Sequence, residues 1–282
     1  MSNDRLFWRG LRWAAGSLGL AAGGYGTMVG LAWHRYGHAA HPIGEEKDVL
    51  LDRFIPDYEV AERHHVRVTA PAAITLGAAG DTDLQQSRIV RAIFKTRALV
   101  LGAGADRAAR PKGLLAEVKA LGWGVLAETP GREIVMGAVT QPWMANVVFR
   151  ALPPDAFAAF KEPGYVKIAW TLRADPTGPG ASIFRTETRV ATTDQTARAR
   201  FRWYWARFSP GIVLIRRVML GLLKTEAERR ARLRCPPQAD RFLVRLKPDA
   251  PYDEGEANAV SEARVRPRSR GRWRPGSFQP HA

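Results

Sequence analysis

The sequence has a single cysteine, Cys235, among its 282 residues. One thiol cannot form a disulfide within the chain, and it cannot supply a cysteine cluster for a metal. Cys235 is followed by two prolines and has no neighbour in the sequence that would activate it. The sequence therefore indicates an unreactive thiol just beyond the end of a helix, and a cysteine nucleophile is not expected.

The short motifs of several enzyme classes are also missing. There is no phosphate-binding P-loop, no dinucleotide fingerprint, no nucleophile elbow and no metal-ligand spacing. His34, His38 and His41 are irregularly spaced and have no partner ligands nearby. His64 and His65 are adjacent on an expected strand, so they point to opposite faces of it. We expect no cofactor and no metal.

Acidic residues are scarce relative to basic ones. The chain has 43 Lys and Arg against 27 Asp and Glu, which gives a net charge of +16. Such a charge favours an anionic membrane surface or nucleic acid as partner, although a solvated basic surface is the simpler interpretation. Alternate arginines from Arg264 to Arg274 surround Trp273, and like charge with little apolar content predicts a disordered basic tail over 233–282. This tail would suit anionic lipid headgroups or RNA, with nucleic acid the less favoured partner.

Formal charge is absent from the 21 residues between Trp13 and Trp33. This length matches a helix that crosses a bilayer, and tryptophan at both ends suits the two interfaces. The run is rich in Gly and Ala, which makes its insertion energy marginal. We predict a single-pass anchor at 13–33 within an N-terminal segment 1–36, on either side of the membrane. A cleaved signal peptide and a soluble or peripheral helix are the alternatives.

The longest periodic segment runs from Thr193 to Arg232. Its apolar residues recur every three or four positions, which predicts an amphipathic helix that Thr193 or Asp194 can cap. Ser209-Pro210-Gly211 should kink this helix or divide it in two. Such a helix needs a sheet to cover its apolar side, and strand patterns precede it at 61–71, 123–129, 133–140, 146–152, 165–173 and 181–191.

The order of these elements predicts an α+β fold. A strand comes first, then a helical excursion over 72–121, then several antiparallel strands and the long helix. We expect a curved antiparallel sheet gripping the long C-terminal helix in a domain over 61–232. An N-terminal apolar helix, a connector at 37–60 and the disordered C-terminal tail complete the chain. In the connector, residues 48–56 should form a short helix or turn that docks on the domain.

This layout resembles the START-like helix-grip superfamily (SRPBCC), which includes polyketide cyclase-like and lipid-transfer proteins. The chain looks most like a bacterial branch known mainly as uncharacterised proteins. Six strands are expected here, whereas the superfamily usually has seven. The resemblance spans 61–232 and is carried by the segments His64–Pro71, Gly122–Val139, Pro163–Trp170 and Phe184–Val190.

The resemblance implies a cavity between sheet and helix that binds a hydrophobic small molecule or a lipid. With the apolar run at 13–33, the leading hypothesis is therefore a membrane-tethered binding protein. The superfamily shares no catalytic residue set, so none is carried over. The oligomeric state and the ligand stay open. The predicted ligand-binding residues are Trp123, Met136, Trp170, Glu187 and Trp205.

Glu187 is the one weak catalytic candidate. It shares a strand face with Arg185 and Arg189, which is either the solvent face or a face that buries a carboxylate against an arginine. In the second case Glu187 would anchor a ligand or act as an acid or base, since an apolar pocket displaces the pKa of a carboxyl group. A cyclase-type or hydrolase-type enzyme is therefore the alternative function.

Overall fold

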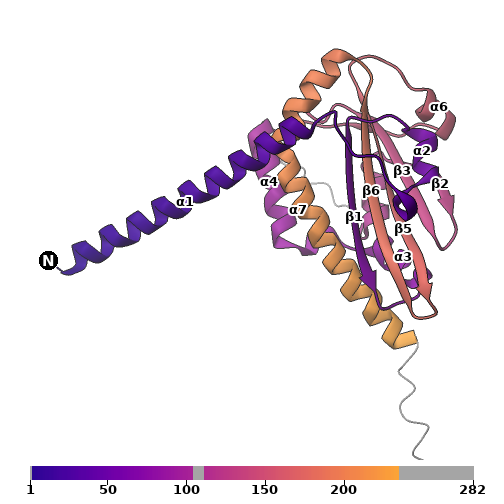
Figure 1. Ribbon diagram of the computed structural model, residues 1–282, viewed down its shortest axis with the longest axis horizontal. Coiled ribbons are helices and arrows are strands. Elements are labelled where there is room, and N and C mark those ends of the chain that lie inside the picture. The colour runs from indigo at the N-terminus through magenta and orange to yellow at the C-terminus, as the bar shows by residue number, and fades with distance from the viewer. Residues whose placement is uncertain (1, 104–110, 235–282) are drawn as a thin grey trace, which may run out of the picture. The chain divides into compact units, whose positions relative to one another are not determined.

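The computed structural model describes residues 2–103 and 111–234 (Figure 1). Most of the predicted tail, with Cys235 and the arginines of 264–274, lies outside the described residues. The helices are α1 (Ser2–Arg35), α2 (Val49–Phe54), α3 (Ala72–Asp81), α4 (Arg88–Leu101), α5 (Leu114–Ala120), α6 (Pro154–Ala159) and α7 (Gln195–Arg234), with short 3-10 helices η1 (Gly44–Glu46) and η2 (Leu84–Gln86). The strands are β1 (Val60–Val68), β2 (Gly124–Thr129), β3 (Glu133–Thr140), β4 (Phe149–Arg150), β5 (Val166–Gly178) and β6 (Ala181–Thr192).

The described strands form one antiparallel sheet in the order β1-β6-β5-β3-β2, and β4 pairs with β3. The predicted strand at 146–152 shrinks to the two residues of β4, because the next segment forms α6, which the sequence analysis did not predict. Pro154 at the first position of α6 favours this helix, since its fixed φ suits a first turn. The α+β class and the curved sheet with a long C-terminal helix are confirmed.

The two faces of the sheet pack against different helices (Figure 1). Side chains alternate along a strand, so Phe184 of β6 faces α3 and α7 while Arg189 faces α2. On the α7 side there are two apolar clusters. The large cluster includes Val68, Leu76, Met136, Trp170, Leu172, Phe184, Met219 and Leu223. The small cluster includes Tyr36, Val60, Val166, Val190, Phe201 and Trp205.

The opposite face is covered by the connector and α6. Leu51, Phe54 and Ile55 are buried there against Val135 and Phe157, in what we call the α2 cluster. Asp48 caps α2, since its Oδ1 accepts a hydrogen bond from the backbone N–H of Leu51 at 2.8 Å. The prediction that this part of the connector forms a short helix docked on the domain is confirmed.

Helix α7 runs without a break from Gln195 to Arg234. Asp194 caps it by accepting from the backbone N–H groups of Thr196 and Ala197. Pro210 lies inside the helix, so of the two predicted outcomes the division into two helices is wrong, while a kink agrees with the change of direction of α7 in Figure 1. The helix packs on α1, α3, α4 and β1, and this packing outweighs the one hydrogen bond that the proline removes.

Helix α1 includes the apolar run predicted to cross a membrane. Its C-terminal part packs on α7: the hydroxyl of Tyr25 donates to the carbonyl of Arg207, and the ring of Trp33 meets that of Trp203 at 4.8 Å. Within residues 2–103 and 111–234, no helix has both the length and the hydropathy of a membrane span. The predicted single-pass anchor is therefore not supported.

Candidate functional site

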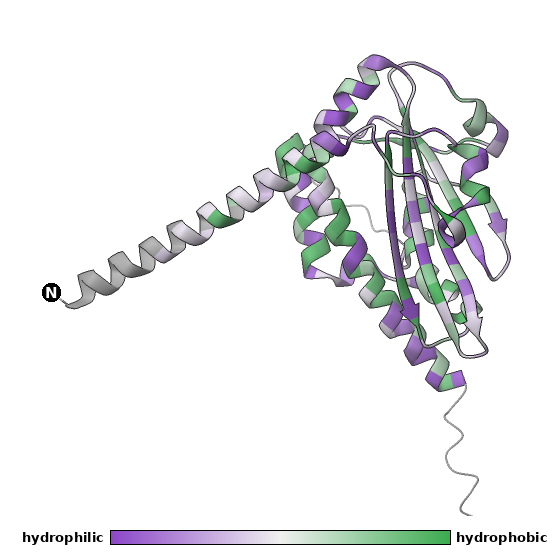
Figure 2. Cartoon of the chain, in the orientation of Figure 1, coloured by the Kyte–Doolittle hydropathy of each residue, from purple (hydrophilic) through white to green (hydrophobic). Residues whose placement is uncertain are grey.

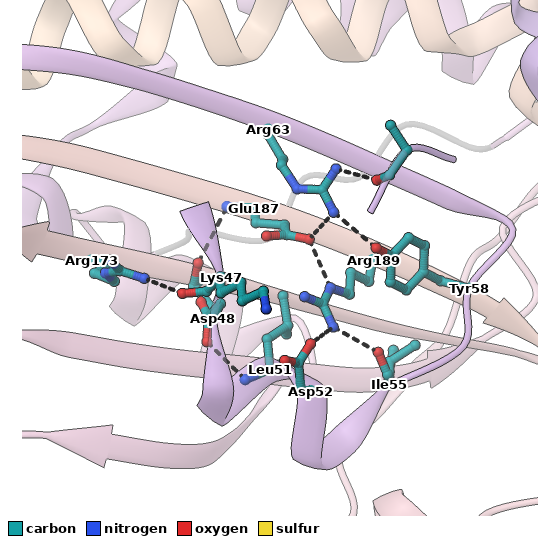
Figure 3. A network of polar contacts seen from close by, with 12 residues as sticks. Lys47, Asp48, Leu51, Asp52, Ile55, Tyr58, Arg63, Arg173, Glu187 and Arg189 are labelled. Atoms are coloured by element: carbon teal, nitrogen blue, oxygen red, sulfur yellow. Dashed lines mark hydrogen bonds and ion pairs between the residues drawn. The ribbon is translucent and has the colours of Figure 1, made fainter. Parts of the chain in front are cut away.

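Glu187 lies at the centre of a buried network of charges on the α2 side of the sheet (Figure 3). Its Oε1 accepts hydrogen bonds from Nη2 of Arg63 on β1, at 2.8 Å, and from Nε of Arg189, at 2.7 Å. It is buried and faces α2, so it lies neither on a solvent face nor beneath α7. Its carboxylate is already bound by two guanidinium groups, which suits a structural role.

Arg189 connects this network to the connector. Its side chain is fully buried and donates from Nη1 to the carboxylate of Asp52 and to the carbonyl of Ile55. The same guanidinium lies 4.8 Å from the ring centroid of Tyr58. A buried arginine is tolerable only when most of its donors are satisfied; the connector supplies the acceptors of Nη1 and Glu187 that of Nε, while Nη2 is buried without a partner. The network therefore holds residues 48–58 on the sheet.

A cavity of about 30 Å3 lies beside this network. That is room for about one water molecule, so it cannot hold a lipid or a cyclic substrate. All its lining residues are of charged or polar types, unlike the mostly apolar and aromatic residues expected around a hydrophobic ligand. The lining residues are Glu46, Asp48, Arg63, His64, His65, Thr171, Arg173, Arg185, Thr186 and Glu187.

The other predicted ligand-binding residues lie on the α7 side. Met136 and Trp170 are opposite each other on β3 and β5, and both are buried in the large cluster. The ring of Trp123 meets that of Trp170 edge to face at 6.0 Å, so these three residues lie together. Trp205 belongs to the small cluster, beside Phe201. The structure thus brings together three of the five predicted residues and separates Trp205 and Glu187 from them.

Between the large and the small cluster, the α7 side of the sheet is polar rather than apolar. On β6, Thr186 and Thr188 stand between Phe184 of the large cluster and Val190 of the small one. On β1, Glu62 and His64 stand between Val60 and Val66 in the same way, and α7 contributes Arg216. We call Glu62, His64, Thr186, Thr188 and Arg216 the polar layer.

The strand register and one hydrogen bond hold the polar layer together. His64 pairs with Thr186 and Glu62 pairs with Thr188 across β1 and β6, which puts all four side chains on one face. From α7, Nη1 of Arg216 donates to Oγ1 of Thr186 at 3.2 Å. Polar residues of β1, β6 and α7 therefore lie side by side between the two apolar clusters. The interruption of the core involves all three elements and is not confined to one strand.

Three atoms of the polar layer are buried without a hydrogen-bond partner. They are Nε2 of His64, Oγ1 of Thr188 and Nε of Arg216. Nε2 of His64 lies 3.6 Å from Oε2 of Glu62, which is too long for a good hydrogen bond. Leaving a buried polar group unpaired costs about 1–3 kcal/mol, so three at one level call for an explanation.

Burial also shifts the pKa values of this group. Burial, together with the nearby Arg216 and Arg217, lowers the pKa of His64 to about 4. Burial likewise lowers the pKa of Arg216 to about 10, against the opposing effect of Glu62, and it raises the pKa of Glu62. At neutral pH the layer therefore presents a neutral imidazole and a poorly solvated guanidinium cation.

The sequence analysis missed the polar layer because it followed the other face of the same strand. The signal was present in β6. Phe184, Thr186, Thr188 and Val190 share one face of the strand, so two threonines interrupt a face that is apolar on either side. Two hydroxyl residues at apolar positions are a weak pattern in one strand. The matching interruption of β1 and α7 becomes visible only when the elements are packed together.

No model of a protein family matches the sequence, and no curated protein matches it. Among solved structures, the chain is similar to the di-domain ARO/CYC BexL from the BE-7585A biosynthetic pathway, at 15% identity and a TM-score of 0.24 over 60% of this chain. It spans 46% of the length of that protein.

The Zhui aromatase/cyclase from Streptomyces sp. R1128 matches at 16% identity and a TM-score of 0.22, over 61% of this chain and 94% of its own. Ara h 8.0201 matches at 10% identity and a TM-score of 0.20, over 60% of this chain and 97% of its own. Likeness at these scores defines no family, so the START-like resemblance stays a prediction.

Proposed function

We propose that the protein binds a compact amphipathic acid between its sheet and α7, with the anionic group of the ligand at the polar layer. The observation that carries this proposal is the set of three buried unpaired atoms on His64, Thr188 and Arg216. Small-molecule sites combine mostly apolar walls with a few convergent polar groups, and these three groups converge between two apolar clusters.

The chemistry of the three groups favours an anion. Arg216 is a cation that burial has deprived of water, and a carboxylate or phenolate would replace that water with a charge-assisted hydrogen bond. The hydroxyl of Thr188 can donate a hydrogen bond to the same anionic group. The neutral imidazole of His64 can donate a second one in the tautomer that carries its proton on Nε2. A neutral alcohol or amide would gain less from the cation.

The packing favours a compact ligand over a long-chain lipid. Met136, Leu172 and Leu223 are fully buried in the large cluster, so the space beneath the C-terminal half of α7 is filled. The apolar body would lie against Trp170, which pairs with Thr188 across β5 and β6, and against Ile168, which pairs with Val190. A short-chain or aromatic acid is therefore the ligand class that we propose.

The test is a binding titration of the full-length protein with naphthoate and, as a matched neutral probe, naphthamide. We expect naphthoate to bind more tightly, and Arg216→Met to abolish its advantage over the amide. Arg217→Met is the control, because Arg217 is the next residue on α7 and is exposed. Equal binding of acid and amide, or equal effects of the two substitutions, would contradict the proposal.

The alternative functions inferred from the sequence have less support. Glu187 as an acid or base would need a free carboxylate in a substrate cavity, whereas its Oε1 accepts from two arginines beside a cavity of about 30 Å3. Attachment through the Arg-rich tail concerns residues outside those that the structure describes. Both stay predictions.

A further inference from the structure

Helix α4 carries cations without compensating acids. Its sequence, RIVRAIFKTRALVL, contains Arg88, Arg91, Lys95 and Arg97 and neither Asp nor Glu. Serine 87 caps its start, with Oγ accepting from the backbone N–H of Val90, and Gly102 ends it in the left-handed conformation at φ 69°. The helix therefore has a cap at each end, and all its charged residues are basic.

Few side chains attach α4 to the rest of the chain. Val90 is its one fully buried residue, and Ile93 approaches Gly211 of α7 so closely that an added Cβ there would lie 3.1 Å from Cγ2 of Ile93. Arg97 faces inward, donating to the carbonyl of Pro142 at 3.1 Å and lying 5.9 Å from the ring of Tyr204. One of the four cations is thus used in packing.

The rest of α4 mixes apolar with basic residues, which appear as green and purple segments of the helix in Figure 2. The exposed fractions are 83% for Leu99, 64% for Val100, 51% for Ile89 and 47% for Phe94. Arg88 and Lys95 are exposed too, and neither is in an ion pair with any residue of the described part of the chain. Four large apolar residues on one short exposed helix point to a partner.

We propose that α4 docks this protein on an anionic lipid surface. Arg88 and Lys95 would contact the headgroups, while Leu99, Val100 and Ile89 enter the boundary between headgroups and acyl chains. A helix that combines Lys and Arg with Leu, Ile and Phe, and that is short and low in mean hydropathy, is suited to lie in an interface. This docking is independent of the polar layer and of any ligand there.

Other occupants fit less well. A second copy of the chain would place one cationic helix near another protein of net charge +16, which is electrostatically unfavourable. Nucleic acid would pair with the cations but gives aliphatic side chains such as Leu99 and Val100 nothing comparable to bind, since bases stack on aromatic rings and guanidinium planes. An anionic lipid surface offers charged headgroups to the cations of α4 and acyl chains to its exposed apolar side chains.

The electrostatic part is tested by sedimentation of the full-length protein with vesicles of equal parts phosphatidylcholine and phosphatidylglycerol, against vesicles of phosphatidylcholine alone. We expect binding to the anionic vesicles only. The double variant Arg88→Gln/Lys95→Gln should weaken it about thirtyfold, because each cation near an anionic surface contributes about a factor of five. The control Arg53→Gln/Arg132→Gln removes the same charge from side chains 65% and 60% exposed and should change binding little.

The apolar part is tested with Leu99→Ser/Val100→Ser, which should weaken vesicle binding also at high salt, where charge is screened. Ile43→Ser/Val49→Ser is the control, with exposed fractions of 84% and 78% on the connector. The proposal is overturned if the wild-type protein ignores anionic vesicles, if the α4 variants bind as it does, or if each control loses as much as its partner variant. Loss of RNA binding or of self-association in the α4 variants, with vesicle binding intact, would also overturn it.

Discussion

Arg189 and Glu187 stand next but one to each other on β6 and form a buried ion pair, with Nε of the arginine 2.7 Å from Oε1 of the glutamate. Alternate residues of a strand share a face, so the backbone itself sets this pairing. Arg63 on the neighbouring strand binds the same oxygen. The charge of one buried carboxylate is therefore balanced by two arginines, and both of them also bind the connector.

Glu187→Gln should destabilise the fold by about 3 kcal/mol, because it leaves the buried Arg189 and its neighbour Arg63 with one carboxylate, that of the half-exposed Asp52, in place of two. The free energy of unfolding, measured by denaturant titration of the full-length protein, checks this. Glu162→Gln is the matched control: Glu162 pairs with Arg150, but the two side chains are 49% and 43% exposed. An exposed pair contributes little, so this variant should stay within about 0.5 kcal/mol of wild type. A Glu187→Gln protein of wild-type stability that loses a measured activity would restore the catalytic interpretation.

Gly122 positions Trp123 and the start of β2, and it tolerates no side chain. Its φ is +101°, and an added Cβ would lie 2.2 Å from the carbonyl oxygen of Phe149. Gly122→Ala should therefore cost more than about 2 kcal/mol, from backbone strain and from the clash. Gly131→Ala separates the two causes, because Gly131 also has positive φ but has open space around it. Its cost should be about 1 kcal/mol. Equal losses in the two variants would show that the clash relaxes freely.

Much of the fold could be predicted from local patterns. The helix over 193–232 and the alternating strand at 181–191 have periods that sequence alone reveals, and α7 and β6 follow them. A division at Pro210 was one of the two predicted outcomes because the local cost of a proline is visible in the sequence, whereas the packing that keeps the helix continuous is not. The two-residue β4 and the unexpected α6 reflect the same limit, since short elements depend on tertiary contacts.

The candidate site was less predictable for a related reason. Periodicity places Trp123, Met136 and Trp170 on apolar positions, and these do meet in the large cluster. Periodicity cannot tell which face of β6 turns toward α7, and Glu187 was therefore assigned to a ligand cavity that lies on the other side. Arg216 is one of many arginines of α7, and only packing distinguishes it.

His64 should make the stability of the protein depend on pH. Burial and the nearby arginines hold the pKa of His64 in the folded protein at about 4, below the usual 6.5. Between pH 4 and pH 6.5, His64 is therefore protonated in the unfolded chain and neutral in the folded protein. The stability is therefore complete above pH 6.5 and falls as the pH drops through that window, by on the order of 3 kcal/mol at pH 4. His64→Gln should remove this loss. Denaturant titrations of both proteins across that window check it.

His65→Gln is the control for this measurement, because His65 is exposed on the opposite face of β1 and should leave the slope unchanged. Glu133 acts in the opposite sense. Burial and the neighbouring Asp48 raise its pKa to about 8, so its contribution is present at low pH and is lost as the pH rises from 4.5 toward 8. The difference between wild type and His64→Gln cancels that effect. A difference that does not change with pH would mean that His64 is not buried as described.

Arg216→Met should separate function from stability. A buried guanidinium with an unpaired Nε costs free energy, and methionine can fill similar volume without that cost. In the absence of added acid we expect the variant to be about as stable as wild type, because relief of the unpaired guanidinium is offset by loss of the cation that stabilises the Glu62 carboxylate. In saturating naphthoate the wild type should be the more stable protein, because the ligand binds more tightly to the protein that keeps the cation. Arg217→Met should change the free energy of unfolding neither without ligand nor in saturating naphthoate. If Arg216→Met destabilises the protein without ligand, the arginine is a structural residue, and the polar layer is part of the fold rather than a binding site.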